Sequence, residues 1–147
     1  TLHTNSAVGA VTRLRDMGVE PFLLSSSLLG VLAQRLVRLL CDECKEPYTA
    51  NSVDCERLGF DTNNPPTLYR AKGCAKCTYQ GYRGRSGIYE LVELDDVLRE
   101  MIHDGSGEHA LEGYARKHTP SIRQDGIRRV LAGQTTVEEV LRVTKDG

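Results

Sequence analysis

The chain has 147 residues, a formal net charge of −1 and 27% charged residues. This length allows one ordinary domain, or two small ones, with a buried core. The near-neutral charge argues against a basic protein that coats nucleic acid and against an acidic tail. The longest apolar run, 28–33, is far too short to cross a bilayer, and no signal-peptide pattern opens the sequence, so we expect a cytosolic protein.

The first segment predicts a strand end followed by a helix. Residues 1–4 have no start signal of their own and look like the end of a strand that begins outside this sequence. Asn5 or Ser6 can cap a helix, apolar residues follow at helical spacing, and Gly18 provides a stop.

A second helix is expected from about Ser25 to Leu40. Leucine and valine recur around most of its circumference, so most of this helix should be buried. The exception is a narrow polar stripe in which Gln34, Arg35 and Arg38 are spaced to lie on one face. This stripe is available to a partner.

The sequence changes character after residue 40. Residues 41–87 hold three of the five prolines and many glycines, a composition that predicts loops and short strands held together by something other than a large apolar core. A strand is expected at 88–94. Helices with apolar stripes are then predicted at 95–103, 108–118, 121–131 and 136–144. Thr135 with Glu138, and Thr136 with Glu139, both match a capping box near the start of the last helix.

Four cysteines form two pairs with the same spacing, Cys41 with Cys44 and Cys74 with Cys77. A tight turn over each pair can direct two sulfurs at one point, about 3.5 to 4 Å apart, as tetrahedral zinc–sulfur bonds require. Four protein ligands leave no position for water, so the zinc ion would be structural and would not activate a nucleophile. It would join the ends of a loop, 45–73, that has little hydrophobic content of its own.

Two other interpretations of these cysteines stay open on the residues alone. A disulfide pair is disfavoured in the cytosol, and a redox dithiol is expected at a helix N-terminus, whereas Cys41 and Cys44 follow a predicted helix. The fifth cysteine, Cys55, belongs to neither pair. We expect it to be an ordinary loop or partly buried thiol, with a role as an alternative ligand as the other possibility.

Four strings carry a resemblance to a known family: TLHTNSA, GVLAQRLVRLLC, GYRGRSGIYELVEL and IRQDGIRRVLAGQTTVEEVLRVT. They resemble the C-terminal end of the ATPases that energise type II secretion and type IV pilus assembly, and the type II secretion ATPases match best. The resemblance covers nearly all of the chain and includes both cysteine pairs.

The resemblance implies an α/β fold that is mainly helical in this segment. Residues 1–40 would complete a RecA-like ATPase domain, residues 41–87 would form a tetracysteine zinc-binding subdomain that serves as a docking module, and residues 88–147 would add a strand and a C-terminal helical bundle. The whole protein would be a cytoplasmic hexamer, attached to inner-membrane platform proteins, that uses ATP and Mg²⁺ to drive pseudopilus assembly. No GxxxxGK[ST] phosphate-binding loop occurs in this sequence, so the chain alone should not hydrolyse ATP.

The resemblance also implies roles for three residues. His3 would belong to the family's histidine box, near the terminal phosphate, and would help to sense hydrolysis. Arg35 and Arg38 would contact a neighbouring subunit or another partner, and a solvated helix face is the alternative.

The strongest rival is a zinc-ribbon module that binds nucleic acid. Basic and aromatic residues interleave around the second cysteine pair: Tyr69, Arg70, Lys72, Lys76, Tyr79, Tyr82, Arg83 and Arg85. Such a module would bind nucleic acid with a steep salt dependence, whereas the ATPase interpretation predicts no nucleic-acid binding by this chain. A thiol oxidoreductase would instead show disulfide exchange and little tightly bound metal.

Overall fold

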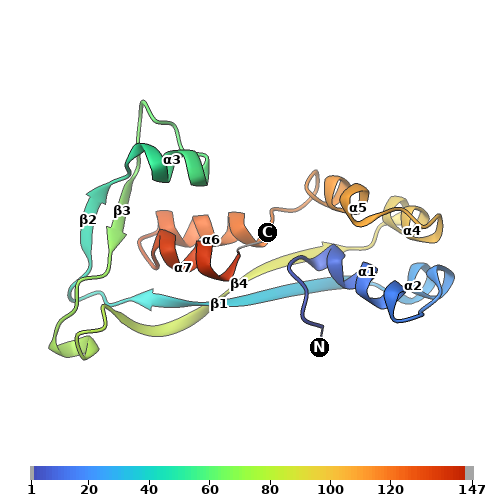
Figure 1. Ribbon diagram of the computed structural model, residues 1–147, viewed down its shortest axis with the longest axis horizontal. Coiled ribbons are helices and arrows are strands. Elements are labelled where there is room, and N and C mark those ends of the chain that lie inside the picture. Colours follow the sequence, from blue (N-terminus) through green and yellow to red (C-terminus); the bar gives the residue numbers. More distant parts are fainter. Residues whose placement is uncertain (1, 145–147) are drawn as a thin grey trace. The chain divides into compact units, whose positions relative to one another are not determined.

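The computed structural model describes residues 2–144, which fold into two compact units. The first unit comprises residues 2–34 and 89–122, and the second comprises residues 35–88 and 123–144. Two long strands, β1 (Gly30–Leu40) and β4 (Tyr82–Glu93), pair with each other and run in opposite directions (Figure 1). The boundary between the units falls within both strands. The mixed helix and sheet content predicted from the sequence is confirmed.

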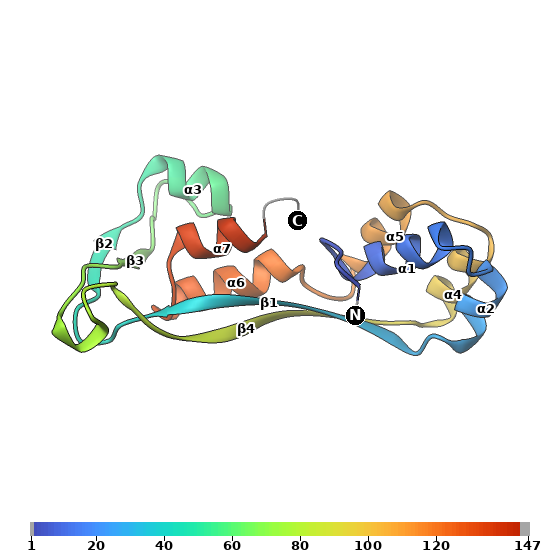
Figure 2. The same ribbon diagram turned by 60° about the horizontal axis from the view of Figure 1, so that its bottom comes forward.

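The first unit is built mainly from helices, which are α1 (Ala7–Asp16), α2 (Pro21–Ser27), α4 (Asp96–His103) and α5 (Glu108–Ala115). α2 packs against α4, and α1 packs against α5 (Figure 2). The predicted start of α1 is confirmed, because Ser6 Oγ accepts a hydrogen bond from the Gly9 N–H at 3.1 Å. The strand end expected at 1–4 is not found at 2–4, where the chain forms no strand, and Thr1 lies outside the described residues.

A buried carboxylate holds the first unit together. The Ala7 N–H at the start of α1 donates a hydrogen bond of 3.0 Å to Glu90 Oε1, and the other carboxylate oxygen forms an ion pair with Arg116. The Glu90 side chain is 1% exposed. A negative charge at the N-terminus of α1 interacts favourably with the helix dipole, so Glu90 stabilises the contact between α1 and β4.

The helix predicted from about Ser25 to Leu40 is wrong over most of its length. α2 ends at Ser27, and 30–40 is the strand β1. Along 30–38 the even-numbered residues are exposed, while the odd-numbered ones are buried or partly buried, which is the two-residue period of a strand. Ala33 and Val37 are both buried. Ala33 and Val37 are four residues apart, and this spacing places two side chains on the same face in a strand as well as in a helix. The sequence pattern therefore fits both structures.

The second unit begins with short elements. β2 (Glu46–Thr49) pairs antiparallel with β3 (Thr67–Arg70), and the connection between them contains a short helix, α3 (Ser52–Leu58). The one-turn helix η1 (Ala75–Cys77) precedes β4. The loops and short strands predicted for 41–87 are confirmed in kind. The helix α3 was not predicted, and β4 begins six residues before the predicted strand at 88–94.

Two helices complete the second unit, α6 (Ile122–Leu131) and α7 (Val137–Val143). They lie side by side against the part of β1 and β4 that belongs to this unit (Figures 1 and 2). The turn between α6 and α7 is bonded to β1, because the Leu40 N–H donates to the Gln134 carbonyl at 2.8 Å. The helices predicted near 95–103, 108–118, 121–131 and 136–144 are all confirmed, with ends that differ by up to three residues. The three consecutive parts 1–40, 41–87 and 88–147 stay a prediction.

The close packing of α6 on α7 explains a glycine in the middle of α6. A Cβ atom on Gly126 would lie 2.6 Å from Val140 Cγ1 and 3.3 Å from Ile88 Cδ1. Gly126→Ala is therefore expected to destabilise the second unit by about 1 to 3 kcal/mol, measured by urea unfolding. Gly113→Ala in α5 is the matched control, because nothing lies within 4 Å of that position, and it should stabilise by up to about 1 kcal/mol. An unchanged unfolding midpoint for Gly126→Ala would contradict this packing.

Within residues 2–144 there is no helix with both the length and the apolar character needed to span a membrane.

Candidate metal centre

Two turns of the second unit bring four cysteines together. Cys41 follows β1, and Cys44 lies in the turn that the Lys45 N–H closes on the Cys41 carbonyl at 3.0 Å. Cys74 caps η1, and Cys77 is its last residue. Cys41 and Cys77 are buried, and Cys44 and Cys74 are partly exposed.

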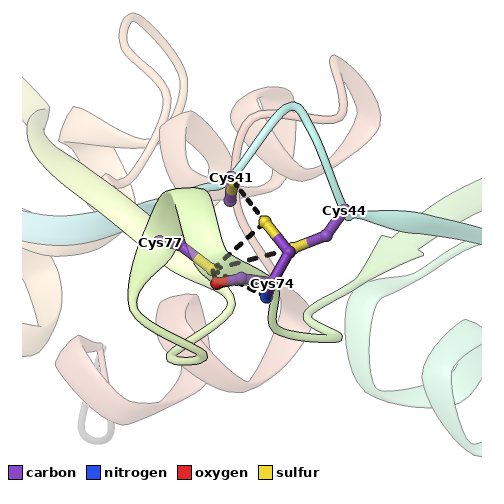
Figure 3. Close-up of side chains that lie close together, drawn as sticks. All are labelled: Cys41, Cys44, Cys74 and Cys77. Carbon is purple, nitrogen blue, oxygen red and sulfur yellow. Dashed lines mark hydrogen bonds between the residues drawn. The ribbon is translucent and has the colours of Figure 1, made fainter.

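The four sulfurs point toward one another and have the spacing of a tetrahedral site (Figure 3). The Sγ–Sγ distance is 3.9 Å for Cys41 and Cys74, and 3.8 Å both for Cys44 and Cys77 and for Cys74 and Cys77. All four sulfurs lie within 4.8 Å of one another. Four sulfurs at zinc–sulfur bond lengths of about 2.3 Å would be separated by about 3.8 Å in a regular tetrahedron. The residues are therefore positioned to hold one metal ion.

Backbone N–H groups from the second turn surround the sulfurs. The Gly73 N–H donates to Cys44 Sγ at 3.3 Å, and both the Cys74 and the Gly81 N–H donate to Cys77 Sγ at 3.2 Å. Such donors favour the thiolate over the neutral thiol. They also orient the sulfurs in the way that groups around a metal site orient its ligands.

The pKa values of the two cysteines that receive these hydrogen bonds shift in opposite directions. Burial alone would raise the pKa of Cys77, but hydrogen bonds from the N–H groups of Cys74 and Gly81, and from the Cys44 and Cys74 thiols, together outweigh it and lower that pKa to about 6. Burial dominates at Cys44 and raises its pKa to about 11. A thiolate thus forms readily at Cys77, whereas an ion must displace a proton at Cys44. Metal binding should therefore weaken as the pH falls.

Glycines on both sides of the second cysteine pair are required by the geometry. A Cβ atom on Gly73 would lie 2.9 Å from the Tyr79 carbonyl oxygen, and one on Gly81 would lie 2.6 Å from Ala71 Cβ. Both glycines also have positive φ angles, +112° and +81°. These residues let the chain turn tightly enough for Cys74 and Cys77 to face the first pair.

Lysines near the cysteines support the surrounding structure. Lys45 Nζ donates to the Gly133 carbonyl at 2.8 Å and lies 4.7 Å from the centre of the Tyr69 ring. Lys72 pairs with Glu46 at 3.2 Å. Lys45 thereby links the turn after Cys44 to the turn between α6 and α7.

The remaining cysteine is separate from this cluster. Cys55 is buried in α3, with 1% of its surface exposed, and the four clustered sulfurs do not include it. The expectation of a buried or partly buried thiol outside the metal site agrees with this position, although the residue lies in a helix and not in a loop.

The structure places the two arginines on a strand and leaves their proposed contacts as predictions. Arg35 and Arg38 belong to β1, where residues three apart lie on opposite faces, so the shared polar stripe expected on a helix is wrong. Arg38 packs over the Tyr82 ring, 4.1 Å from its centre. His3 is exposed and lies in no helix or strand, and its role in sensing hydrolysis stays a prediction.

A buried glutamate of the second unit was missed by the sequence analysis. Glu139 is 1% exposed and accepts hydrogen bonds from Arg38 and Arg142. The capping-box pattern gave its position in α7, and Thr136 Oγ1 does accept from the Glu139 N–H at 3.2 Å. The pattern did not indicate that the side chain binds two arginines.

Two of the three tyrosines assigned to the rival nucleic-acid surface, Tyr69 and Tyr82, are in contact with cations of the chain itself. Lys45 lies over Tyr69, and Arg38 lies over Tyr82. In addition, Arg70 lies 4.4 Å from the centre of the Tyr48 ring. A ring covered on one face by a cation is less available for stacking on a base, so these contacts do not favour the rival.

The fold and the site together define the class of protein: a mixed α/β chain in which four cysteines can enclose one metal ion. The family model of the type II/IV secretion system proteins matches residues 1–142. The chain belongs to this family, which confirms the resemblance that the sequence strings indicated.

Curated relatives agree over almost the whole chain. The type II secretion system protein E of Pseudomonas aeruginosa is 64% identical over 146 residues, and the type II secretion system ATPase E of Vibrio cholerae is 61% identical over 146 residues. The corresponding protein of Aeromonas hydrophila is 57% identical over 146 residues. Each alignment covers 99% of this chain but only 29% of the relative, so the chain spans less than a third of their length.

Proposed function

We propose that the chain is the zinc-bearing, C-terminal region of an ATPase that powers type II protein secretion. The observation that carries this proposal is the 61% identity, over 99% of the chain, to a relative named as a type II secretion system ATPase. In the whole protein, ATP and Mg²⁺ would bind to a RecA-like domain that residues 1–40 complete, and His3 would lie near the terminal phosphate. This chain alone would not hydrolyse ATP.

The ion in the cysteine cluster would be zinc. Four thiolates form a soft donor set, and tetrahedral coordination by four sulfurs is typical of structural zinc sites. Cys41, Cys44, Cys74 and Cys77 would hold the ion, and the backbone N–H groups of Gly73, Cys74 and Gly81 would stabilise the thiolates. Bound zinc supplies a fixed cross-link between the two turns.

The cross-link would make the segment between the cysteine pairs a rigid docking module. That segment contains β2, α3 and β3, and few of its side chains are buried: Ala50, Cys55, Leu58 and Leu68. So small a core contributes little folding energy, and metal binding can supply the remainder. We propose that this module contacts an inner-membrane platform protein, and that the whole ATPase is a cytoplasmic hexamer at the inner membrane that drives pseudopilus assembly.

A chimera tests this function. The corresponding region of the Pseudomonas aeruginosa relative would be replaced by this chain, which is 64% identical to it, in cells that lack their own copy. The chimera should restore secretion. A Cys41→Ser/Cys44→Ser chimera should lose about 90% or more of secretion while the purified protein still binds nucleotide, because zinc removal unfolds the docking module and leaves the nucleotide site intact.

A Cys55→Ala chimera is the matched control, since Cys55 lies outside the cluster, and it should secrete normally. Full secretion by the double serine chimera in the absence of zinc would reject the docking role. Failure of the unaltered chimera to secrete, with the protein folded and present, would reject the assignment to a type II secretion ATPase.

A further inference from the structure

The second unit contains a pocket of about 460 Å³ that the metal centre does not use. Strands β1 and β4 supply most of its lining, α7 supplies one arginine, and the loop before β4 supplies Gln80: Leu36, Arg38, Gln80, Tyr82, Gly84, Arg85 and Arg142. Three arginines from three separate elements therefore meet at one open surface. Lysines and arginines also outnumber aspartates and glutamates in the described part of this unit.

The buried carboxylate of Glu139 accepts hydrogen bonds from two of these arginines, Arg38 and Arg142. Arg38 donates to Glu139 Oε1 through Nε at 3.0 Å and through Nη2 at 2.7 Å. Arg142 donates through Nε to Oε1 at 3.2 Å and through Nη2 to Oε2 at 3.0 Å. The glutamate side chain is 2% exposed, whereas the two arginine side chains are 47% and 56% exposed. Each guanidinium thus binds the buried carboxylate with one edge and has donors left on its other edge.

Aromatic packing holds one of the guanidiniums in place. The Arg38 guanidinium lies 4.1 Å from the centre of the Tyr82 ring. The Tyr82 hydroxyl is in turn hydrogen-bonded to Thr136 Oγ1 at 2.9 Å. A guanidinium fixed by a carboxylate and a ring loses little conformational entropy when it binds a ligand, which favours affinity.

Arg85 adds a third positive charge. Its side chain is exposed, and within residues 2–144 it forms no ion pair. No aspartate or glutamate is among the described residues that line the pocket, and the buried carboxylate of Glu139 binds two of the three guanidiniums. The pocket therefore carries a net positive charge that is directed to solvent.

We propose that this pocket binds a carboxylate-rich segment of a partner protein. Glu139 already shows that Arg38 and Arg142 bind a carboxylate by forked hydrogen bonds. Leu36, which is 47% exposed, offers apolar surface for the methylene groups of acidic side chains. No helix N-terminus, the frequent source of phosphate-binding N–H groups, is among the lining residues. The proposal does not depend on the secretion function.

Binding of a labelled hexaglutamate peptide to the zinc-loaded chain, followed by fluorescence anisotropy, tests the proposal. The unaltered chain should bind this peptide, and a hexaglutamine peptide should not bind. Arg85→Gln should weaken binding about tenfold, because a charge-assisted contact is lost. Arg128→Gln is the matched control in the same unit, since Arg128 is exposed on α6 and outside the pocket, and it should change affinity less than about twofold.

Three outcomes would overturn the proposal. The first is absence of peptide binding at about 150 mM salt, where contacts between exposed charges are strongly screened. The second is an equal loss of affinity in Arg85→Gln and Arg128→Gln, which would indicate attraction by overall charge. The third is displacement of the peptide by pyrophosphate at a much lower concentration than by free hexaglutamate, which would assign the pocket to phosphate.

Discussion

Cys74→Ser is expected to lower the zinc content of the purified chain from one ion per chain to below about 0.1, because three thiolates bind zinc far more weakly than a closed set of four. The loss should be accompanied by local unfolding. Structural zinc contributes about 10 to 16 kcal/mol of apparent binding energy in small zinc domains, and this energy would no longer be available to the segment between the cysteine pairs. Metal analysis after gel filtration gives the zinc content. Amide hydrogen exchange should show faster exchange in β2 and β3.

Cys55→Ala provides the control for this experiment. Cys55 is as buried as Cys41, each 1% exposed, so its replacement also disturbs packed structure. It should nevertheless leave one zinc ion per chain, because its sulfur is outside the cluster. Zinc loss in Cys55→Ala, or full zinc content in Cys74→Ser, would show that the four-cysteine assignment is wrong.

The clustering of the four cysteines agrees with the prediction from the sequence, because the turn within each pair is a local feature. Two cysteines separated by two residues form a turn wherever the backbone permits, and Gly73 and Gly81 permit it at the second pair. Helix starts were also predictable, since Ser6, Asp95 and Thr136 each accept a hydrogen bond from a backbone N–H within their own first turn.

The strand β1 shows why other parts could not be predicted. Its apolar residues have a spacing that fits both a helix and a strand, and its pairing partner, β4, lies more than forty residues further along the chain. No local signal decides between the two structures. The pairing with β4 does, and it is a tertiary contact that overrides helical propensity.

The contacts of Glu139 with Arg38 also join segments that are far apart in the sequence, so they could not be predicted from either segment alone. Arg38 and Glu139 are 101 positions apart, and each looks like an ordinary charged surface residue in its own segment. The contact sits next to the metal centre in sequence, since Cys41 follows Arg38 by three residues. Thr135 Oγ1 also donates to the Arg38 carbonyl at 2.7 Å, and the Arg38 N–H donates to Glu139 Oε2 at 2.8 Å, so the turn before α7 and α7 itself both bind the backbone of β1 at this residue.

Glu139→Gln should reduce the stability of the second unit at about pH 7 by about 2 to 3 kcal/mol, measured by urea unfolding of the zinc-loaded chain. A glutamine cannot neutralise the two arginines, and its amide nitrogen would oppose their donors. Removing one partner of a fully buried ion pair typically costs about 3 to 5 kcal/mol. The expected loss is smaller here because both arginines are half exposed. Glu138→Gln, on the exposed side of α7, is the control and should change stability by less than about 0.5 kcal/mol.

The pH dependence of this difference separates an ionic contact from simple packing. Burial alone would raise the pKa of Glu139 above its ordinary 4.5, but hydrogen bonds from Arg142 and Arg38 outweigh it and lower the pKa to about 2. A carboxylate with a lowered pKa in the folded state contributes stability above its unfolded pKa and loses it as the pH falls toward the folded pKa. The difference in free energy of unfolding between the unaltered chain and Glu139→Gln should therefore become smaller as the pH falls below about 5. Zinc release in acid affects both proteins alike and cancels in the comparison. A difference that stayed constant down to about pH 3 would mean that Glu139 acts through its shape and not through its charge.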